Sequence, residues 1–263
     1  MERIGRLATI SRYPVKSMAG EAVDAVFAGF SGVMGDRAYA FLSQHEARKG
    51  FPWYTARQQE NLVRYHPRYR DDTASRLPGD VGISLAIRPG ARTVFPGPDA
   101  FALDVRLPDG RTLPIDSREL QDDLQSHAGK QLMLRYSEHS LTDCRPLSLL
   151  GIPTVQALCE AIGRSIDPRR FRANLYADWN NEQPFREDGL IGRTLQLGDR
   201  LRIVILERDP RCKMITLDPD TGEMDASILR HVAQAHGGEI GVYAAVLVEG
   251  VVRSGDPIYL VQQ

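Results

Sequence analysis

Cys212 lies in the part of the sequence that is best suited to chemistry. It follows an apolar run and Pro210, and the cations Arg211 and Lys213 stand on either side of it. Positive neighbours favour the thiolate form of cysteine, which binds soft metal ions and attacks sulfur. We therefore expect Cys212 to act as a metal ligand or as a sulfur-handling thiolate.

The other two cysteines have weaker patterns. Cys159 lies in an apolar helical pattern and is expected to pack in a core. Cys144 stands between Asp143 and Arg145, a setting that is compatible with either role. Because the three cysteines are far apart and form no CxxC pair, the sequence predicts neither a disulfide framework nor a zinc ribbon.

Lys16 and Ser17 follow Pro14 at the end of a predicted strand. Proline cannot continue a central strand, so the chain must turn there. The turn places Lys16 and Ser17 at a strand exit, where they could grip an anion. The alternative is a solvated lysine on a loop.

Arg37 and Arg57 are two further candidates in the first quarter of the chain. Asp36 and Arg37 enter a predicted strand after a glycine-rich turn, and in an extended chain they point to opposite faces. One would brace the loop while the other faces a pocket. The alternative is a surface ion pair, which contributes little to stability. Arg57 adds another cation, close to Trp53 and Tyr54.

Residues 169–172 hold three arginines, among them Arg172, and Asn174 follows at the start of a predicted strand. Arginine binds phosphate through two donors and keeps its charge when partly desolvated. Asn174 offers both a donor and an acceptor. The group indicates an anion site, and the alternative is a basic strand edge that discourages aggregation.

Several common signatures are absent from the sequence. It has no GxGxxG and no GxxxxGK[ST] motif, which excludes the usual dinucleotide and phosphate-binding loops. Residues 218–222 imitate a calcium loop, but the glycine comes one position early and Leu229 replaces the bidentate glutamate. We interpret this segment as a turn.

Composition sets broad limits on the kind of protein. The length of 263 residues suits one large or two modest domains. The composition, with 42% hydrophobic and 25% charged residues, is ordinary for a globular protein. A net charge of -1 argues against a general nucleic-acid binder. No apolar run reaches the roughly 18 residues of a membrane helix, and the N-terminus is too polar for a secretory signal. We expect a cytoplasmic protein with no membrane contact.

The hydrophobic pattern predicts a β-rich chain with a few helices. Helices are expected over residues 117–128, 154–162 and 226–235, with Gly129, Gly163 and Gly237 at or close after their ends. Asp109-Gly110 predicts a hairpin turn. Strands are expected over residues 6–13, 22–28, 37–42, 61–65, 82–87, 101–107, 131–136, 173–177, 194–197, 202–207, 242–248 and 258–261.

Taken together, these segments resemble the MOSC-domain proteins, the family named for the C-terminal domain of molybdenum cofactor sulfurases. The match extends over nearly the whole chain in the family's order. In the N-terminal part it rests on residues 13–17, 35–37 and 55–57. In the MOSC part it rests on residues 170–174, 184–188, 191–192, 197–198, 211–212, 218–222, 241–243 and 255–256.

The resemblance implies a β-rich α+β fold, with an N-terminal β-barrel module in residues 1–120 packed on a MOSC β-barrel domain in residues 121–263. It implies a molybdenum cofactor, Mo-molybdopterin, between the two modules, with Cys212 as the thiolate ligand of molybdenum. Pyridoxal phosphate binding is a further property attached to the family as a whole. The residues that match the family's cofactor-binding positions are Lys16, Ser17, Arg37 and Arg172, with Arg57, Asn174, Arg211 and Tyr243 as further pocket residues.

The chain departs from the family in two places, and the milder departure is Ala173, where relatives commonly have proline. Gly151-Ile152 follows Leu149-Leu150, where relatives often have a Ser or Thr pair that reaches the cofactor. Backbone N–H groups near the helix start could substitute for these hydroxyls. The sequence also ends soon after the MOSC part, without the ferredoxin-like module of some bacterial relatives. Electrons are therefore expected to come from a separate protein.

Three functions remain open on this pattern. The first is a molybdenum oxidoreductase that reduces N-hydroxylated small molecules, with the hard chemistry supplied by the cofactor. The second is a sulfur carrier that delivers sulfur from a Cys212 persulfide to a metal–sulfur centre. The third is a cofactor-binding module without turnover.

Overall fold

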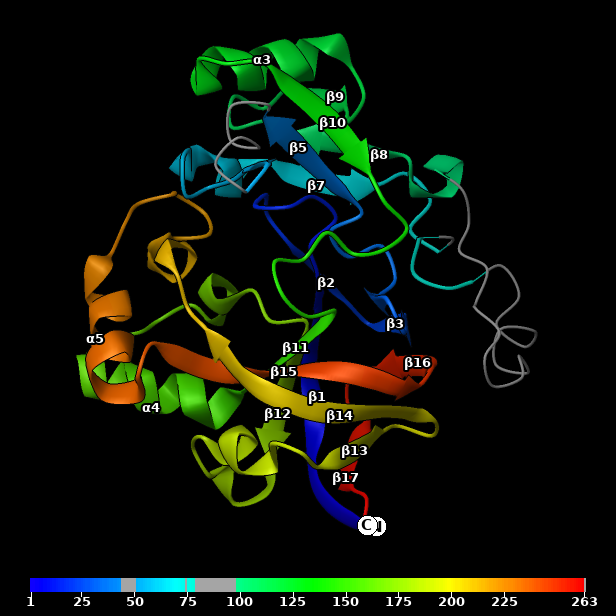
Figure 1. Cartoon of the computed structure of the whole chain (residues 1–263), viewed down its shortest axis with the longest axis vertical. Coiled ribbons are helices and arrows are strands. Elements are labelled where there is room, and N and C mark those ends of the chain that lie inside the picture. Colours follow the sequence, from blue (N-terminus) through cyan, green and yellow to red (C-terminus); the bar gives the residue numbers. More distant parts are fainter. Residues whose placement is uncertain (44–50, 74, 79–97, 263) are drawn as a thin grey trace.

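The computed structural model describes residues 1–43, 51–73, 75–78 and 98–262 (Figure 1). A large twisted sheet forms the lower part of the molecule in this view, and smaller sheets lie above and beside it. Two helices pack against one side of the large sheet, and a third lies over the smaller sheets at the top.

Seven strands of the large sheet close into a barrel. Their order is β12-β11-β15-β14-β13-β17-β1, and an antiparallel pairing of β1 with β12 completes the ring. The neighbours β11 and β12 are parallel, and β2 (Glu21–Val23) extends the sheet beyond β1. The barrel strands are β1 (Glu2–Arg12), β11 (Leu147–Gly151), β12 (Leu175–Trp179), β13 (Thr194–Leu197), β14 (Leu201–Pro210), β15 (Glu239–Val248) and β17 (Pro257–Leu260).

Alternation of apolar and polar side chains explains why these segments form barrel strands. In β14, Leu201, Ile203 and Ile205 are fully buried, whereas Arg202 between them is exposed. Successive side chains of a strand point to opposite faces, so this pattern places one face of β14 in the barrel core.

Three small sheets surround the barrel. One contains β10 (Leu132–Tyr136), β5 (Tyr39–Ser43) and β6 (Trp53–Tyr54), and another contains β7 (His66–Tyr69), β8 (Leu103–Arg106) and β9 (Thr112–Pro114). The third contains β16 (Gly250–Arg253), β3 (Ala25–Gly29) and β4 (Gly32–Val33). The predicted hairpin between β8 and β9 is confirmed, with Gly110 at a φ of 92°.

The predicted fold class, a β-rich α+β fold with a β-barrel, is confirmed. Among the described residues, however, the strands of residues 1–120 outside the large sheet form open three-stranded sheets, and β1 belongs to the barrel itself. Two of the small sheets also combine strands from both halves of the chain. The division into residues 1–120 and 121–263 stays a prediction.

The three predicted helices are confirmed as α3 (Arg118–Ala128), α4 (Ile152–Ile162) and α5 (Ala226–His236). The Ser117 side chain caps α3 by accepting a hydrogen bond from the Leu120 amide, and each helix ends at a glycine with positive φ. No helix in the described part of the chain is long and apolar enough to cross a membrane.

One strand prediction is wrong. Residues 61–65 form most of the 3-10 helix η1 (Glu60–Arg64), in which Leu62 and Val63 are buried. A short apolar run does not distinguish a strand from one helical turn. The predicted strand 82–87 lies outside the described residues. The other 3-10 helices are η2 (Pro98–Phe101), η3 (Pro168–Phe171), η4 (Asn180–Glu182), η5 (Arg186–Leu190) and η6 (Lys213–Thr216).

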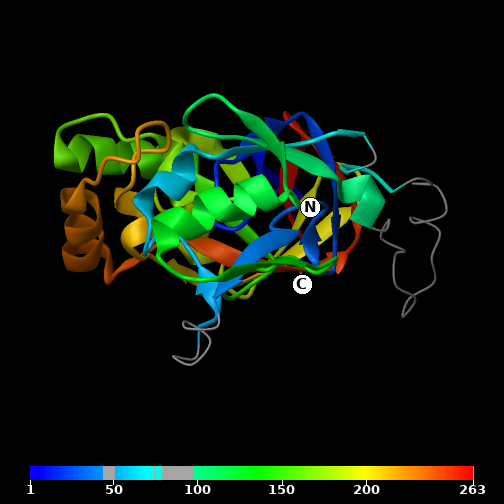
Figure 2. The ribbon, with the colours of Figure 1, turned by 90° about the horizontal axis from the view of Figure 1, so that it is seen from above.

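A second apolar core lies outside the barrel, between its wall and the helices α4 and α5. It contains Val155 and Leu158 from α4 and Ile228 and Val232 from α5. Phe171 of η3 and Ile215 of η6 complete it, and both residues also line the cavity described below. This core therefore fixes the short segments that carry Arg172 and Cys212. Figure 2 shows α4 and α5 together at one end of the molecule.

Candidate functional site

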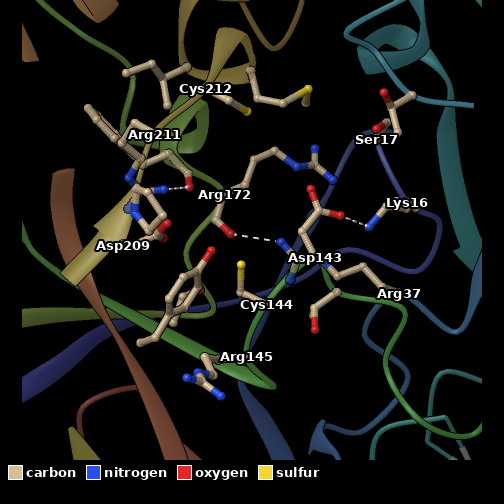
Figure 3. Close-up of a pocket in the computed structure, with 18 of the residues that line it drawn as sticks. Lys16, Ser17, Arg37, Asp143, Cys144, Arg145, Arg172, Asp209, Arg211 and Cys212 are labelled. Atoms are coloured by element: carbon tan, nitrogen blue, oxygen red, sulfur yellow. Dashed lines mark hydrogen bonds and ion pairs between the residues drawn. The ribbon is translucent and has the colours of Figure 1, made fainter. Parts of the chain in front are cut away.

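A cavity of about 440 Å³ opens between the barrel and the small sheets. In Figure 3, Lys16, Ser17 and Arg37 enter it from one side, and Asp209, Arg211 and Cys212 enter it from the other. All nine residues predicted from the sequence line this cavity: Lys16, Ser17, Arg37, Arg57, Arg172, Asn174, Arg211, Cys212 and Tyr243.

The cavity is strongly basic. Seven cationic side chains line it, against two carboxylates, Asp143 and Asp209. The cations are Lys16, Arg37, Arg57, Arg145, Arg170, Arg172 and Arg211. A near-neutral protein therefore has a local field suited to an anion.

Two arginines lie against one buried ring, that of Tyr13. The guanidinium carbon of Arg37 lies 4.7 Å from the centre of the Tyr13 ring, and that of Arg172 lies 4.2 Å from it. Arg37 also donates from Nη2 to the carbonyl of Arg172 at 3.1 Å. Cation–π contacts thus bring two like charges close together in a buried place.

Arg172 is the cation whose charge is least compensated. Its Nη1 donates to the carbonyl of Met18 at 2.7 Å, whereas its buried Nη2 has no hydrogen-bond partner. Within the described residues it forms no ion pair, unlike the other six cations of the cavity. Burial, together with the charge of Arg37, lowers the pKa of Arg172 to about 10. An anion in the cavity would relieve both effects.

The structure corrects the predicted surroundings of Arg172. Residues 168–171 form the 3-10 helix η3, Arg172 adopts a left-handed conformation with a φ of 52°, and β12 begins only at Leu175. Arg172 therefore lies on a turn and not on a strand. The alternative of a solvated basic strand edge does not hold for this side chain.

Asp36 and Arg37 form a buried ion pair with an Nη1–Oδ2 distance of 2.6 Å. Asp36 is 2% exposed, and its other oxygen accepts from the Tyr13 amide at 2.8 Å. Although burial lowers the pKa of Arg37, the pair with Asp36 raises it overall. The prediction of an extended pair on opposite faces is wrong, because Arg37 has a φ of 46° and turns back onto its neighbour.

Lys16 and Arg57 share one carboxylate, that of Asp143. Lys16 is only 8% exposed and also donates to the carbonyl of Leu141 at 2.7 Å. Burial lowers the pKa of Lys16, while the pair with Asp143 opposes the shift. Lys16 is therefore not the solvated loop lysine of the alternative interpretation.

Arg211 holds the wall of the cavity together. It donates from Nε to the carbonyl of Ile240 at 2.7 Å and from Nη1 to that of Phe171 at 2.8 Å. Its Nη2 lies 3.0 Å from Oδ2 of Asp209, in a geometry that satisfies the ion-pair distance but not a hydrogen bond. Arg211 thus shapes the cavity, and most of its donors already have protein acceptors.

Asn174 also connects strands at the cavity floor. Its Oδ1 accepts from the amide and hydroxyl of Ser148, and its Nδ2 donates to the carbonyl of Ser11 at 3.3 Å. The suggestion that backbone N–H groups near the start of α4 face the cofactor fails for Gly151, whose amide donates to Glu187 at 3.0 Å.

Three of the six non-glycine residues with positive φ in the described part of the chain lie at this site. Ser17, Arg37 and Arg172 have positive φ angles of 67°, 46° and 52°, although none of them is glycine. Residues other than glycine rarely adopt this backbone conformation. The buried contacts of these three residues stabilise it here. Such strain is typical of sites where geometry serves binding more than stability.

Two exposed thiols line the cavity, Cys212 and Cys144. Cys212 lies at the end of β14, just before η6, and Cys144 lies on the segment that leads into β11. Cys159 instead packs against the second core, where its Sγ accepts from the Ile166 amide at 3.2 Å. Cys159 is thus the packed thiol that the sequence predicted.

The sequence interpretation missed several cavity residues, chiefly Asp143, Asp209, Arg145 and Ser148. Single carboxylates and hydroxyls in turns have no periodic signal. Asp143 and Asp209 could have been suspected only because each lies within two residues of a position discussed above, Cys144 or Arg211.

Comparisons with known proteins match part of the chain in one case and the whole chain in another. Residues 136–259 match the model of the MOSC domain. The whole chain is 23% identical over 301 aligned positions to mitochondrial amidoxime reducing component 2 of Bos taurus, covering 85% of that protein.

Solved structures give more distant similarities. The YuaD protein of Bacillus subtilis aligns over 97% of this chain and 94% of its own, with 11% identity and a TM-score of 0.48. YiiM of Geobacillus stearothermophilus aligns over 45% of this chain and 55% of its own, with 18% identity and a TM-score of 0.34.

Proposed function

We propose, for a chain that carries a MOSC domain in residues 136–259, that its basic cavity binds a molybdenum–pterin cofactor with Cys212 as the protein ligand of the metal. The loaded protein would be an oxidoreductase that reduces N-hydroxylated small molecules. The full-length similarity to a protein named as an amidoxime reducing component supports this choice of reaction.

The observation that carries the proposal is the uncompensated guanidinium of Arg172. Its Nη2 is buried without a partner, beside Arg37 on the shared Tyr13 ring. An unpaired buried donor on a charged group costs free energy, which an acceptor on a bound ligand would return. The phosphate and the polar ring edges of a pterin cofactor supply such acceptors, so the residues present fit the group.

The cavity residues divide into two roles. Lys16, Ser17, Arg37 and Arg172 would hold the pterin and its phosphate, since forked arginine donors match phosphate oxygens. Arg57, Asn174, Arg211 and Tyr243 would form the wall. The exposed Cys212 thiol would reach the metal, because soft thiolates suit molybdenum already bound by sulfur.

Oxygen-atom and two-electron transfer would be supplied by the cofactor when bound. The chain itself would bind and orient the cofactor and the substrate. The cavity volume of about 440 Å³ falls in the range of small-molecule and cofactor pockets. A separate electron-transfer protein would deliver the electrons.

The reaction is tested by reducing an N-hydroxylated amidine with cofactor-loaded protein and a chemical electron donor. We expect turnover proportional to molybdenum content, and its loss in Cys212→Ser with full retention in the matched variant Cys159→Ser. Molybdenum-loaded wild type without turnover on any N-hydroxylated substrate would contradict the reductase assignment and leave a cofactor-binding module.

A sulfur carrier is the second candidate, favoured by the two exposed thiols in one cavity. Here Cys212 would hold a persulfide and deliver sulfur to a metal–sulfur centre. Cyanide-labile sulfur on Cys212 in protein free of molybdenum would favour this candidate.

A further inference from the structure

Asp143 places a carboxylate inside a cavity that is otherwise suited to anions. It belongs to residues 142–145, all of which line the cavity shortly before β11. Its two oxygens pair with two different cations, one with Nζ of Lys16 and the other with Nη2 of Arg57. Figure 3 shows the carboxylate turned toward Lys16. Asp143 therefore occupies cations that an anionic ligand would use.

The acidic side chains near the cavity cations differ in how firmly they are held. Asp36 is 2% exposed and also accepts a hydrogen bond from a backbone amide at 2.8 Å. Asp209 is 4% exposed and lies within β14. The side chain of Asp143 is 38% exposed, and in the described part of the chain its only hydrogen bonds are those from its two cations. Asp143 is thus the carboxylate that can turn out to solvent at the lowest cost.

Residues 142–145 are held by side chains and not by the backbone. Among the described residues they form no backbone–backbone hydrogen bond. Just before them, the Leu141 amide donates to the carbonyl of Arg37 at 2.9 Å, and just after them β11 begins at Leu147. Their other ion pair joins the half-exposed side chains of Arg145 and Glu207 at 2.7 Å. The segment can therefore move between two fixed points once Asp143 is released.

Other contacts hold the two cations when Asp143 turns away. Lys16 is 8% exposed, and its Nζ also donates to the carbonyl of Leu141 at 2.7 Å. The guanidinium carbon of Arg57 lies 4.6 Å from the centre of the Phe51 ring, a cation–π contact. One oxyanion with several acceptor oxygens can then accept from both cations in place of the carboxylate.

We propose that Asp143 is an internal competitor, which leaves Lys16 and Arg57 when a dianionic oxyanion such as a phosphate monoester enters the cavity. The oxyanion accepts the hydrogen bonds that Asp143 gives up, and Asp143 turns out to solvent with residues 142–145. A dianion interacts more strongly with these cations than the single charge that it replaces. Arg57 then contacts the bound anion and is more than a part of the wall. The identity of this anion as the cofactor phosphate rests on the proposed function.

Calorimetric titration of the cofactor-free protein with sulfate, at constant ionic strength, tests the competition. Asp143→Asn should bind sulfate about tenfold more tightly than wild type, because a charge-assisted hydrogen bond no longer has to be broken. The matched control is Asp178→Asn, which removes the partner of the exposed Arg6 and should leave the affinity unchanged. Equal or weaker binding by Asp143→Asn would overturn the proposal, and weaker binding would show that Asp143 orients the cations.

A crystal structure of cofactor-free wild type, at a sulfate concentration well above the measured Kd, separates displacement from simple repulsion. We expect sulfate oxygens within hydrogen-bond distance of both Lys16 and Arg57, with Asp143 turned away from them. Sulfate bound elsewhere, or beside an Asp143 that still pairs with Lys16, would contradict the exchange.

The proposed function and the role of Asp143 can fail separately. Wild-type protein that takes up neither molybdenum nor pterin contradicts the function, whereas the sulfate titration needs no cofactor and still decides the role of Asp143. In loaded protein, Asp143→Asn should retain at least as much cofactor as wild type after gel filtration. Loss of cofactor from Asp143→Asn, with full retention in wild type, contradicts the competition and leaves the function intact.

Discussion

Arg172 is the cation of the cavity whose charge is least compensated by protein groups. It is buried, lies against the Tyr13 ring as Arg37 does, and has one donor without a partner. Ion pairs compensate the other cations of the cavity within the described residues. At the scale of single residues, the site therefore depends most on this guanidinium.

Replacing Arg172 with glutamine should weaken retention of the cofactor by roughly tenfold to a hundredfold, the value of about 1.5–3 kcal/mol for a charge-assisted hydrogen bond. Thermal stability of the unloaded protein should not fall, because an unpaired buried charge is removed. Cofactor per protein after gel filtration measures the effect. The exposed Arg6→Gln is the matched control, and equal retention in both variants would contradict the assignment.

The affinity of the cavity for anions should fall at alkaline pH. The pKa of Arg172 is lowered to about 10 and that of Lys16 is lowered as well, in both cases first by burial. An anion prefers the protonated side chains, so affinity is full at neutral pH and falls as pH rises through about 10. Calorimetric titration with sulfate, whose charge is constant there, checks the trend, and an affinity that stays level up to about pH 11 would refute it.

The types of the site residues were predictable from the sequence, but their conformations were not. Cations and a cysteine at family positions indicated the cavity lining. The left-handed backbone of Ser17, Arg37 and Arg172 has no local sequence signal, since none is glycine. Asp209 was missed because the other residues of the cavity come from distant parts of the chain.

At the scale of elements, Glu187 joins the start of α4 to the barrel. It is fully buried and accepts from the Gly151 amide at 3.0 Å, the Thr154 hydroxyl at 2.8 Å and the Trp179 indole at 2.9 Å. These bonds tie β11, α4 and β12 together, and the second core that packs on α4 fixes η3 and η6.

Glu187→Ala should lower the free energy of unfolding by about 3 kcal/mol, since three buried donors lose their shared acceptor. Urea denaturation measures this value. The exposed Glu160→Ala on α4 is the matched control and should change stability by less than about 0.5 kcal/mol. Equal stability of the two variants would show that water replaces the carboxylate.

Helices and long strands were predictable because their periodicity extends over several turns or residues. The glycines after α3, α4 and α5 marked the helix ends correctly. The strand β11 and the 3-10 helices were not foreseen. β11 is buried throughout and has no polar alternation, and 3-10 turns such as η1 depend on contacts with distant parts of the chain.

At the scale of the whole molecule, the first strand closes the barrel of the last half. β1 pairs with β12 on one side and β17 on the other, although it lies outside the matched residues 136–259. Lys16, Ser17, Arg37 and Arg57 of the cavity also come from the first 57 residues. Fold and site therefore both require the two ends of the chain.

A chain that begins at residue 121 should not form a stable barrel, because β12 and β17 would lose their shared partner and expose two sheet edges. We expect broad NMR spectra and rapid proteolysis. Addition of residues 1–120 as a separate chain should restore dispersed spectra. A well-dispersed spectrum of the shorter chain alone would contradict this view and support an independent domain.

The most direct measurement of the central claim is the molybdenum and pterin content of protein produced with molybdate. Wild type, Cys212→Ala and Cys144→Ala should be compared, since both thiols are exposed in the same cavity. We predict close to one molybdenum and one pterin per chain in wild type and in Cys144→Ala, with molybdenum lost or altered in Cys212→Ala. Folded wild-type protein without molybdenum or pterin would contradict the account.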